Sequence, residues 1–360
     1  MRSGCWFLLP SLTLAYPYFH DGSAIQPDTR SLSEIYHAAL KEGGLVTLWH
    51  GGDEKNQQDG LKLAFEKRFP GMTLNVTVDL SKYLDVDIDE QLARKSLYVD
   101  VAMLQTLQDY PRWKEAGALS PYKPIDFNTV FDQIVDLEGY YMGVRFFHWP
   151  MTWDSSRVKG SGPTGYNDFL GKDYKNKLVL TYPNDDDAVL HNFNKIVQEH
   201  GTSWLDRLLQ QNPRWVRGTQ TPTDIIVNTN SNQTATFAAF GPFGSSSLKA
   251  RVPIKDHFTS WAQTGAIFTE APHPQAARLL MNFVISREWQ QDLVENGLWS
   301  VRKDLSQPSG YNQSLLDMQN TDPLGFRDFM MDREMVERLR FWYEERLGVA
   351  KGLDPIFDNM

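Results

Sequence analysis

The sequence predicts an α/β protein in which two lobes are joined by two extended crossings, and three observations support this. The chain has 360 residues, which is too long for one small domain and suits two lobes of ordinary size. Helix-like and strand-like stretches alternate with short links near the N-terminus, and the alternation restarts at 177–183. Two long extended stretches, 137–158 and 257–274, fit passages between the lobes.

The first lobe begins with a helix whose start is marked by a capping box. Ser31 precedes apolar residues at helical spacing, and Glu34 follows it by three positions. The next stretches alternate: a strand at 45–50, a helix at 61–69, a strand at 72–78, a helix at 88–96 and a strand at 99–104. The short links favour a largely parallel sheet, which places binding groups at the carboxyl ends of its strands.

The second lobe repeats this alternation, and helices follow it. The expected elements are a strand at 177–183, helices at 187–199 and 202–211, a strand at 234–240, a long helical stretch at 274–297 and an amphipathic helix at 332–348. We therefore expect five segments: a signal peptide and leader (1–30), the first part of lobe 1 (31–148), lobe 2 (149–258), the return crossing with the second part of lobe 1 (259–310) and a C-terminal helical segment (311–360).

Composition and charge restrict the partner and the compartment. A net charge of −9 argues against nucleic acid or an anionic membrane surface as the partner. The N-terminus resembles a secretory signal, with Arg2, an apolar run and then Ala15. This segment holds the only cysteine, Cys5, so the cleaved chain would have no disulfide and no thiol chemistry. We expect a secreted protein, extracellular or periplasmic.

Sequence motifs of common catalytic sites are absent. The chain has no GxxxxGK[ST] phosphate loop, no GxSxG nucleophile elbow and no HExxH zinc motif. None of these motifs identifies a reaction, and neither enzymatic activity nor a cofactor is expected.

Two stretches resemble segments of bacterial periplasmic solute-binding proteins. The stretch 276–305 resembles their closing helix, and the matching residues are Phe283, Ser286, Glu288, Gln290, Gly297 and Val301. The stretch 92–124 resembles a helix that leads into an Asp-Val strand, and the matching residues after it are Gly117, Leu119, Pro121 and Tyr122. The resemblance spans about residues 31–310. It is closest to the ferric-iron, thiamine and phosphonate-type binders.

The resemblance implies a two-lobed, periplasmic binding protein-like II fold. In such a fold the ligand cleft lies between the lobes and closes by hinge motion. It also implies a monomer that captures a small-molecule solute and, where one exists, delivers it to a membrane permease of an ABC transporter.

Tyrosine positions bear on the kind of ligand. The iron-binding members of this group hold their metal with two adjacent tyrosines in the second lobe, but the corresponding region here, 223–241, contains no tyrosine. The only adjacent pair, Tyr140-Tyr141, precedes the first crossing. A tyrosine-type ferric site is therefore not expected.

Eleven residues are predicted to contact the ligand because they lie at or just after the ends of strands, at the start of a strand of lobe 2, or on the crossings. Several are aromatic, which suits a flat ring or an organic cation, although core packing explains such residues equally well. The predicted contacts are Trp49, His50, Gly51, Asp53, Met103, His148, Trp149, Asn184, Asp185, Thr234 and Trp261.

The stretch TYPNDDDAVLH, residues 181–191, has carboxylates and an imidazole that invite a metal interpretation. The simpler interpretation is a helix start, with Asn184 or Asp185 as N-cap and the next aspartates at the positive helix end. His191 lies one turn after Asp187 and is expected to pair with it. Three acidic side chains at the cleft would favour a cationic solute, so a cationic or aromatic organic solute is the expected ligand.

Two other classes of function remain open. One is a metal-ion binder of the ferric type that uses His50, Asp53, His148 and the aspartates 185–187. The other is an enzyme on the same fold, similar to the thiamine-pyrimidine synthases, although these use a cysteine-rich motif and this chain offers only Cys5.

Overall fold

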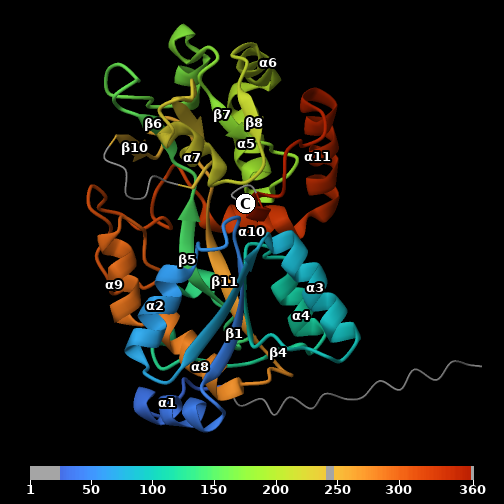
Figure 1. Cartoon of the computed structure of the whole chain (residues 1–360), viewed down its shortest axis with the longest axis vertical. Helices are drawn as coiled ribbons and strands as arrows, with labels where there is room; N and C mark the ends of the chain where they lie inside the picture. Colours follow the sequence, from blue (N-terminus) through green and yellow to red (C-terminus); the bar gives the residue numbers. More distant parts are fainter. Residues whose placement is uncertain (1–24, 241–246, 358–360) are drawn as a thin grey trace, which may run out of the picture.

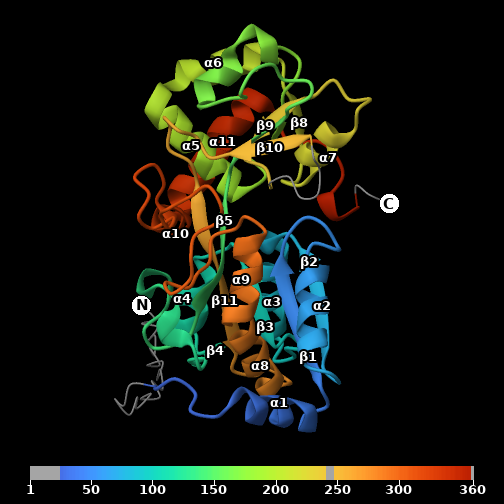
Figure 2. The same ribbon diagram turned by 90° about the vertical axis from the view of Figure 1, so that its left-hand side faces the viewer.

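The computed structural model describes residues 25–240 and 247–357. Within these ranges the chain forms two α/β lobes stacked along the long axis of the molecule, and two strands run between them (Figure 1, Figure 2). The predicted two-lobed α/β fold is thereby confirmed. The signal sequence expected at the N-terminus lies outside the described residues.

Lobe 1 is built on one sheet. Its strands are β1 (Leu45–Gly51), β2 (Thr73–Asp79), β3 (Val101–Leu104), β4 (Leu119–Ser120), β5 (Met142–His148) and β11 (Ser260–Phe268). The order is β2–β1–β3–β11–β4, and β5 also pairs with β11. Strands β1, β2 and β3 are parallel, whereas β11 is antiparallel to its neighbours. The carboxyl ends of β1 and β3 therefore meet at the edge that faces lobe 2 (Figure 1).

Helices flank this sheet. They are α1 (Leu32–Lys41), α2 (Asp59–Arg68), α3 (Ser81–Ala93), α4 (Asp109–Glu115), α8 (Pro274–Val284) and α9 (Arg287–Glu295). The capping box of α1 is confirmed, since Ser31 and Glu34 satisfy each other's backbone N–H groups. Helix α3 begins at Ser81, seven residues before the predicted start. The stretch 274–297 is two helices instead of one, because Ser286 accepts from the N–H of Trp289 and caps a new helix.

Lobe 2 contains two small sheets. The first is antiparallel, with β10 (Leu248–Arg251), β6 (Met151–Asp154) and β9 (Ala235–Phe237) in that order, and the second pairs β7 (Val179–Thr181) with β8 (Arg214–Val216) in parallel. The helices of this lobe are α5 (Asp187–His200), α6 (Thr202–Gln210) and α7 (Thr221–Val227). Short 3₁₀ helices lie in connections: η1 (Phe127–Thr129), η2 (Asp132–Ile134), η3 (Tyr166–Leu170), η4 (Lys172–Tyr174) and η5 (Pro355–Phe357).

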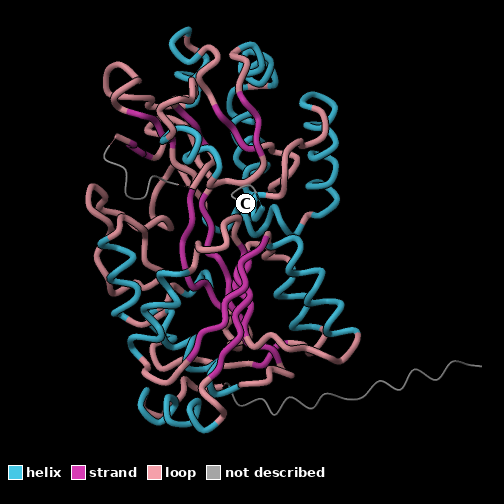
Figure 3. Tube along the Cα trace, viewed as in Figure 1, coloured by secondary structure: helices cyan, strands magenta, loops and turns pink. Residues whose placement is uncertain are grey.

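The C-terminal segment packs on lobe 2. It forms α10 (Pro323–Met331) and α11 (Arg333–Leu347), and α11 lies beside α5 (Figure 1). Phe326, Phe329 and Tyr343 are buried in the same apolar core as Phe193 of α5. Lobe 1 has a separate apolar core, which includes Leu48 and Phe146. Figure 3 shows helices around the strands in both lobes.

Strands β5 and β11 form the crossing between the lobes. They pair from Gly265 to Ser260, and the register shifts next to Gln263, so the ladder carries an irregularity where it enters the cleft. Among the described helices, none is both long enough and apolar enough to span a bilayer.

Candidate functional site: a cavity between the lobes

A cavity lies between the lobes, at the carboxyl ends of β1 and β3. It comprises about 630 Å³ of space, part of which is open to solvent. Lobe 1, the crossing strands and lobe 2 all contribute side chains. The main lining residues are Gly51, Asp53, Ser81, Lys82, Gln105, Thr106, Phe147, Trp149, Asp185, Asp186, Asp187, Thr219, Phe240, Trp261, Gln263 and Arg340.

The lobes are held closed over this cavity by direct hydrogen bonds. Oδ2 of Asp53 on lobe 1 accepts from the backbone N–H groups of Thr219 and Gln220 on lobe 2, and from the Thr219 hydroxyl at 3.0 Å. Lys82 donates to Oδ1 of Asp185 at 2.9 Å, and Gln105 donates to Asp186 at 3.1 Å. Burial raises the pKa of Asp53, although these hydrogen bonds act in the opposite direction.

The three aspartates at the start of α5 already have partners. Asp185 is paired with Lys82 and Arg217, and burial, which alone would raise its pKa, is outweighed by these contacts, so the pKa is lowered. Asp187 is paired with Arg333 and Arg340, both from α11.

Asp186, between them, is the N-cap of α5. Its Oδ1 accepts from the N–H of Val189 at 2.9 Å, so the predicted caps, Asn184 and Asp185, are wrong. The physical reason is competition for their side chains: Asp185 is bound by two cations, and Asn184 donates to the carbonyl of Gly348. Burial raises the pKa of Asp186 to about 6.

His191 does not pair with Asp187 as expected. It is buried, and its Nδ1 lies 3.0 Å from the hydroxyl of Thr259, while the carboxylate of Asp187 faces the arginines of α11. The negative charges of the aspartates 185–187 are therefore balanced by cationic side chains of the protein itself.

Several buried polar atoms around the cavity lack a hydrogen-bond partner within the described residues. They are the indole Nε1 of Trp149, the indole Nε1 of Trp261, Oγ1 of Thr106 and Oδ1 of Asp53. Native proteins rarely leave such groups unsatisfied, because each costs about 1–3 kcal/mol. A ligand that reached these atoms would need acceptor atoms for the two indoles and a donor for Asp53.

Aromatic rings form the wall beside these groups. Phe147 stacks on Trp261 with ring centroids 5.4 Å apart and planes 16° apart, and Trp149 meets Trp261 edge-on at 5.0 Å. Phe240 packs against Phe147 at 5.6 Å. A flat apolar surface therefore adjoins the unpartnered donors.

Arg145 on β5 is a half-buried cation, and within the described residues no counter-charge pairs with it. Its ladder partner is Gln263, which lines the cavity, and its guanidinium lies 4.8 Å from the ring centroid of Phe147 and 5.7 Å from that of Phe240. In the described part of the chain it has no carboxylate in ion-pair contact, and its Nε has no hydrogen-bond partner. Burial lowers its pKa to about 10, so it stays charged at neutral pH.

The structure brings five of the eleven predicted contacts to the cavity: Gly51, Asp53, Trp149, Asp185 and Trp261. The other six lie elsewhere. Trp49 packs edge-on against Tyr98, Asn184 binds Gly348, and the N–H of Thr234 donates to the carbonyl of Lys177. Met103 belongs to the apolar core of lobe 1.

Of the two predicted histidines, His50 is buried and His148 is half-buried, and both are neutral. Burial lowers the pKa of His50 to about 3 and that of His148 to about 4. His50 is bonded to the carbonyl of Gly51, and His148 packs edge-on against Trp299. Among the described residues, the one group of three potential metal ligands is found outside the cavity. The residues named for a metal binder, His50, Asp53, His148 and 185–187, are thus not assembled as ligands.

Several cavity residues were not anticipated from the sequence, notably Lys82, Thr219 and Arg340. Arg145, which lies beside the cavity against Phe147, was not anticipated either. For Arg145 a signal existed, since it is the one charged residue in the apolar run GVRFFHW of the first crossing. The others depend on the closing of two distant segments against each other.

Comparisons with known proteins agree with this architecture. Residues 106–321 match a family described as bacterial extracellular solute-binding protein. A comparison with curated protein sequences finds no significant match.

Similar solved structures include a substrate-binding protein of an ABC transporter from Agrobacterium tumefaciens, at 13% identity and a TM-score of 0.71, covering 86% of this chain and 97% of that one. They also include AfuA from Actinobacillus pleuropneumoniae with fructose-6-phosphate bound, at 14% identity and a TM-score of 0.66, covering 85% and 99%. Iron-bound HitA from Pseudomonas aeruginosa follows at 14% identity and 0.62, covering 83% and 99%.

At these identities the likeness concerns the fold, and it confirms the two-lobed, periplasmic binding protein-like architecture. The family match covers more than half of the chain, and its members are solute-binding proteins. The chain belongs to the bacterial extracellular solute-binding protein family.

Proposed function

We propose that this protein captures a small solute with an anionic group and a flat or apolar part in its interlobe cavity. The single observation that carries the proposal is Arg145, a half-buried guanidinium beside the cavity that has no counter-charge among the described residues. A charge that is partly withdrawn from water is stabilised by an opposite charge, so a carboxylate or phosphate of the ligand is the natural partner.

The charge of this ligand differs from the cationic solute favoured by the sequence alone. That expectation depended on the aspartates 185–187, but each of them is bound by cations or by a helix start. The remaining partnerless groups include two N–H donors, on Trp149 and Trp261, which suit the oxygens of an anion. The aromatic part of the expectation is retained, because Phe147, Phe240 and Trp261 offer a stacking surface.

An anionic solute has a precedent within the fold, since AfuA binds fructose-6-phosphate. Ferric iron, bound by HitA, has less support here. Within the described residues the cavity is lined by neither tyrosine nor histidine. We propose that the protein is secreted, that it holds its solute without chemical change, and that it delivers the solute to a membrane permease where one is present.

Thermal unfolding against a panel sorted by charge tests the proposal. Metal-stripped protein is screened with aromatic carboxylates, sugar phosphates, phosphonates, inorganic phosphate, thiamine and aromatic amines. A ligand at one hundred times its Kd adds about 2.7 kcal/mol to the free energy of unfolding. We expect stabilisation by anions and none by thiamine or amines. Stabilisation by cations alone would refute the anionic assignment, and consumption of a stabilising compound would indicate an enzyme.

A further inference from the structure

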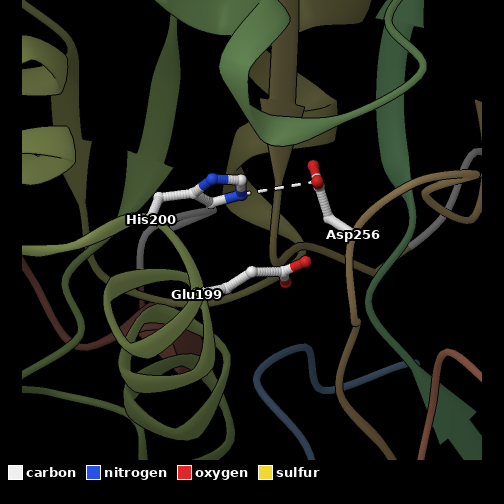
Figure 4. A group of neighbouring side chains, drawn as sticks. All are labelled: Glu199, His200 and Asp256. Atoms are coloured by element: carbon white, nitrogen blue, oxygen red, sulfur yellow. Dashed lines mark ion pairs between the residues drawn. The ribbon is translucent and has the colours of Figure 1, made fainter.

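We propose that Glu199, His200 and Asp256 form a binding site for a divalent metal ion on lobe 2, apart from the ligand cavity. Glu199 and His200 end helix α5, and Asp256 lies in the connection between β10 and β11. One ligand atom from each residue lies within 4.8 Å of the other two. Figure 4 shows the His200 ring pointing at Asp256, with the Glu199 carboxylate beside the gap between them.

The distance between His200 and Asp256 suits a shared metal ion. Nε2 of His200 is buried and has no hydrogen-bond partner in the described chain, and it lies 3.4 Å from Oδ1 of Asp256. This separation is long for a hydrogen bond. Two ligands of a tetrahedral zinc ion, each about 2.1 Å from the metal, lie about 3.4 Å apart.

Charge also favours a cation at this place. Within residues 25–240 and 247–357, neither carboxylate is paired with lysine or arginine. Asp256 contacts His200, and Oε2 of Glu199 accepts from the backbone N–H of His257 at 3.1 Å and lies 3.5 Å from Nδ1 of the same residue. The C-terminal end of α5 adds partial negative charge, which cations stabilise. Two carboxylates and a neutral imidazole supply the charge of −2 and the N/O donors that a zinc ion accepts.

Neighbouring groups orient two of the ligands. The backbone N–H of Tyr166 donates to Oδ2 of Asp256, which leaves Oδ1 turned toward His200. The exposed amide of Asn167 lies 3.3 Å from Nδ1 of His200. A half-turn of this amide places its oxygen there to accept the Nδ1 proton, and Nε2 is then the free ligand atom. An ion so bound would tie the end of α5 to the segment that leads into the return crossing.

Zinc titration of the full chain after chelator treatment tests the site. Calorimetry is expected to show one zinc ion per chain for the wild type, and cobalt in its place should give the visible absorption of a tetrahedral ion. His200→Asn and Asp256→Asn should each weaken zinc binding at least tenfold. His37→Asn removes an exposed imidazole on α1 and serves as the matched control, with unchanged binding.

Glu199→Gln changes an exposed side chain and covers the case in which the buried variants do not fold. It should also weaken zinc binding at least tenfold. Absence of zinc binding in the wild type would overturn the proposal. So would zinc binding of wild-type strength in Glu199→Gln together with either folded variant.

Discussion

Asp53 of lobe 1 and Thr219 of lobe 2 are joined across the cleft, because the backbone N–H and the hydroxyl of Thr219 both donate to Oδ2 of Asp53. Asp53 follows strand β1, and Thr219 lies two residues before helix α7, so these contacts exist only when the lobes are closed. The Asp53 carboxylate therefore stabilises the closed arrangement of the two lobes.

Loss of these hydrogen bonds should favour the open arrangement of the lobes. Asp53→Ala is expected to bind its solute ten- to a hundredfold more weakly, because hydrogen bonds to a charged group contribute about 1.5–3 kcal/mol. Small-angle X-ray scattering should show a larger radius of gyration. Asp87→Ala removes an equal charge from the exposed face of α3 and should change neither property. An Asp53→Ala variant with wild-type ligand affinity and a wild-type radius of gyration would show that Asp53 does not stabilise the closed arrangement.

The C-terminal helix α11 should contribute to the stability of lobe 2 through Arg340. This arginine donates from Nε to the buried Asp187 at 3.0 Å. Arg340→Ala leaves Asp187 with Arg333 alone and should lower the free energy of unfolding by about 1–3 kcal/mol. Arg338→Ala breaks an exposed pair with Glu334 on the same helix and should cost less than about 0.5 kcal/mol. Denaturant unfolding measures both variants. If they lose the same free energy of unfolding, the contact of Arg340 with Asp187 contributes no more to stability than an exposed ion pair.

The buried cap Asp186 should make stability depend on pH. Its pKa is raised to about 6 in the folded protein, so folding favours the protonated form. The stabilisation that protonated Asp186 gives the folded protein is fully present below the unfolded pKa near 3.9, and it is lost as the pH rises through about 6. Relative to wild type, Asp186→Asn should therefore gain on the order of 2 kcal/mol between pH 4 and pH 7. A difference between the two proteins that is constant over this pH range would contradict the assignment.

Arg145 should lower the stability of the ligand-free protein. A half-buried charge without a partner is costly, so Arg145→Met is expected to raise the free energy of unfolding by on the order of 1 kcal/mol. Arg94→Met, which removes an exposed arginine at the C-cap of α3, should have almost no effect. Denaturant unfolding compares the three proteins. A clear loss of stability in Arg145→Met would indicate that the arginine is compensated in the ligand-free state.

Much of the fold could be predicted from local signals. The capping box at Ser31 and the alternation of strands and helices in lobe 1 appear directly in the sequence. The start of α3 was missed because Leu80 and Ser81 provide no side-chain cap to mark it. The division at Ser286 was missed because apolar residues continue at helical spacing on both sides of it.

The site was harder to predict, because its contacts join segments far apart in the sequence. The carboxylate of Asp185 meets Lys82, 103 positions away, and that of Asp187 meets Arg340, 153 positions away. The sequence does not reveal these partners, so the aspartates 185–187 suggested a site for a cation. Residues at strand ends, such as Gly51 and Asp53, were found because parallel sheets direct them to a common edge.

Calorimetric titration of wild type and Arg145→Met with one anionic ligand and its neutral amide or ester tests the central claim most directly. The account predicts that wild type binds the anion at least tenfold more tightly than the neutral analogue, and that Arg145→Met binds both with similar, weak affinity. Undiminished preference for the anion in Arg145→Met, or tighter binding of the neutral analogue by wild type, would contradict it.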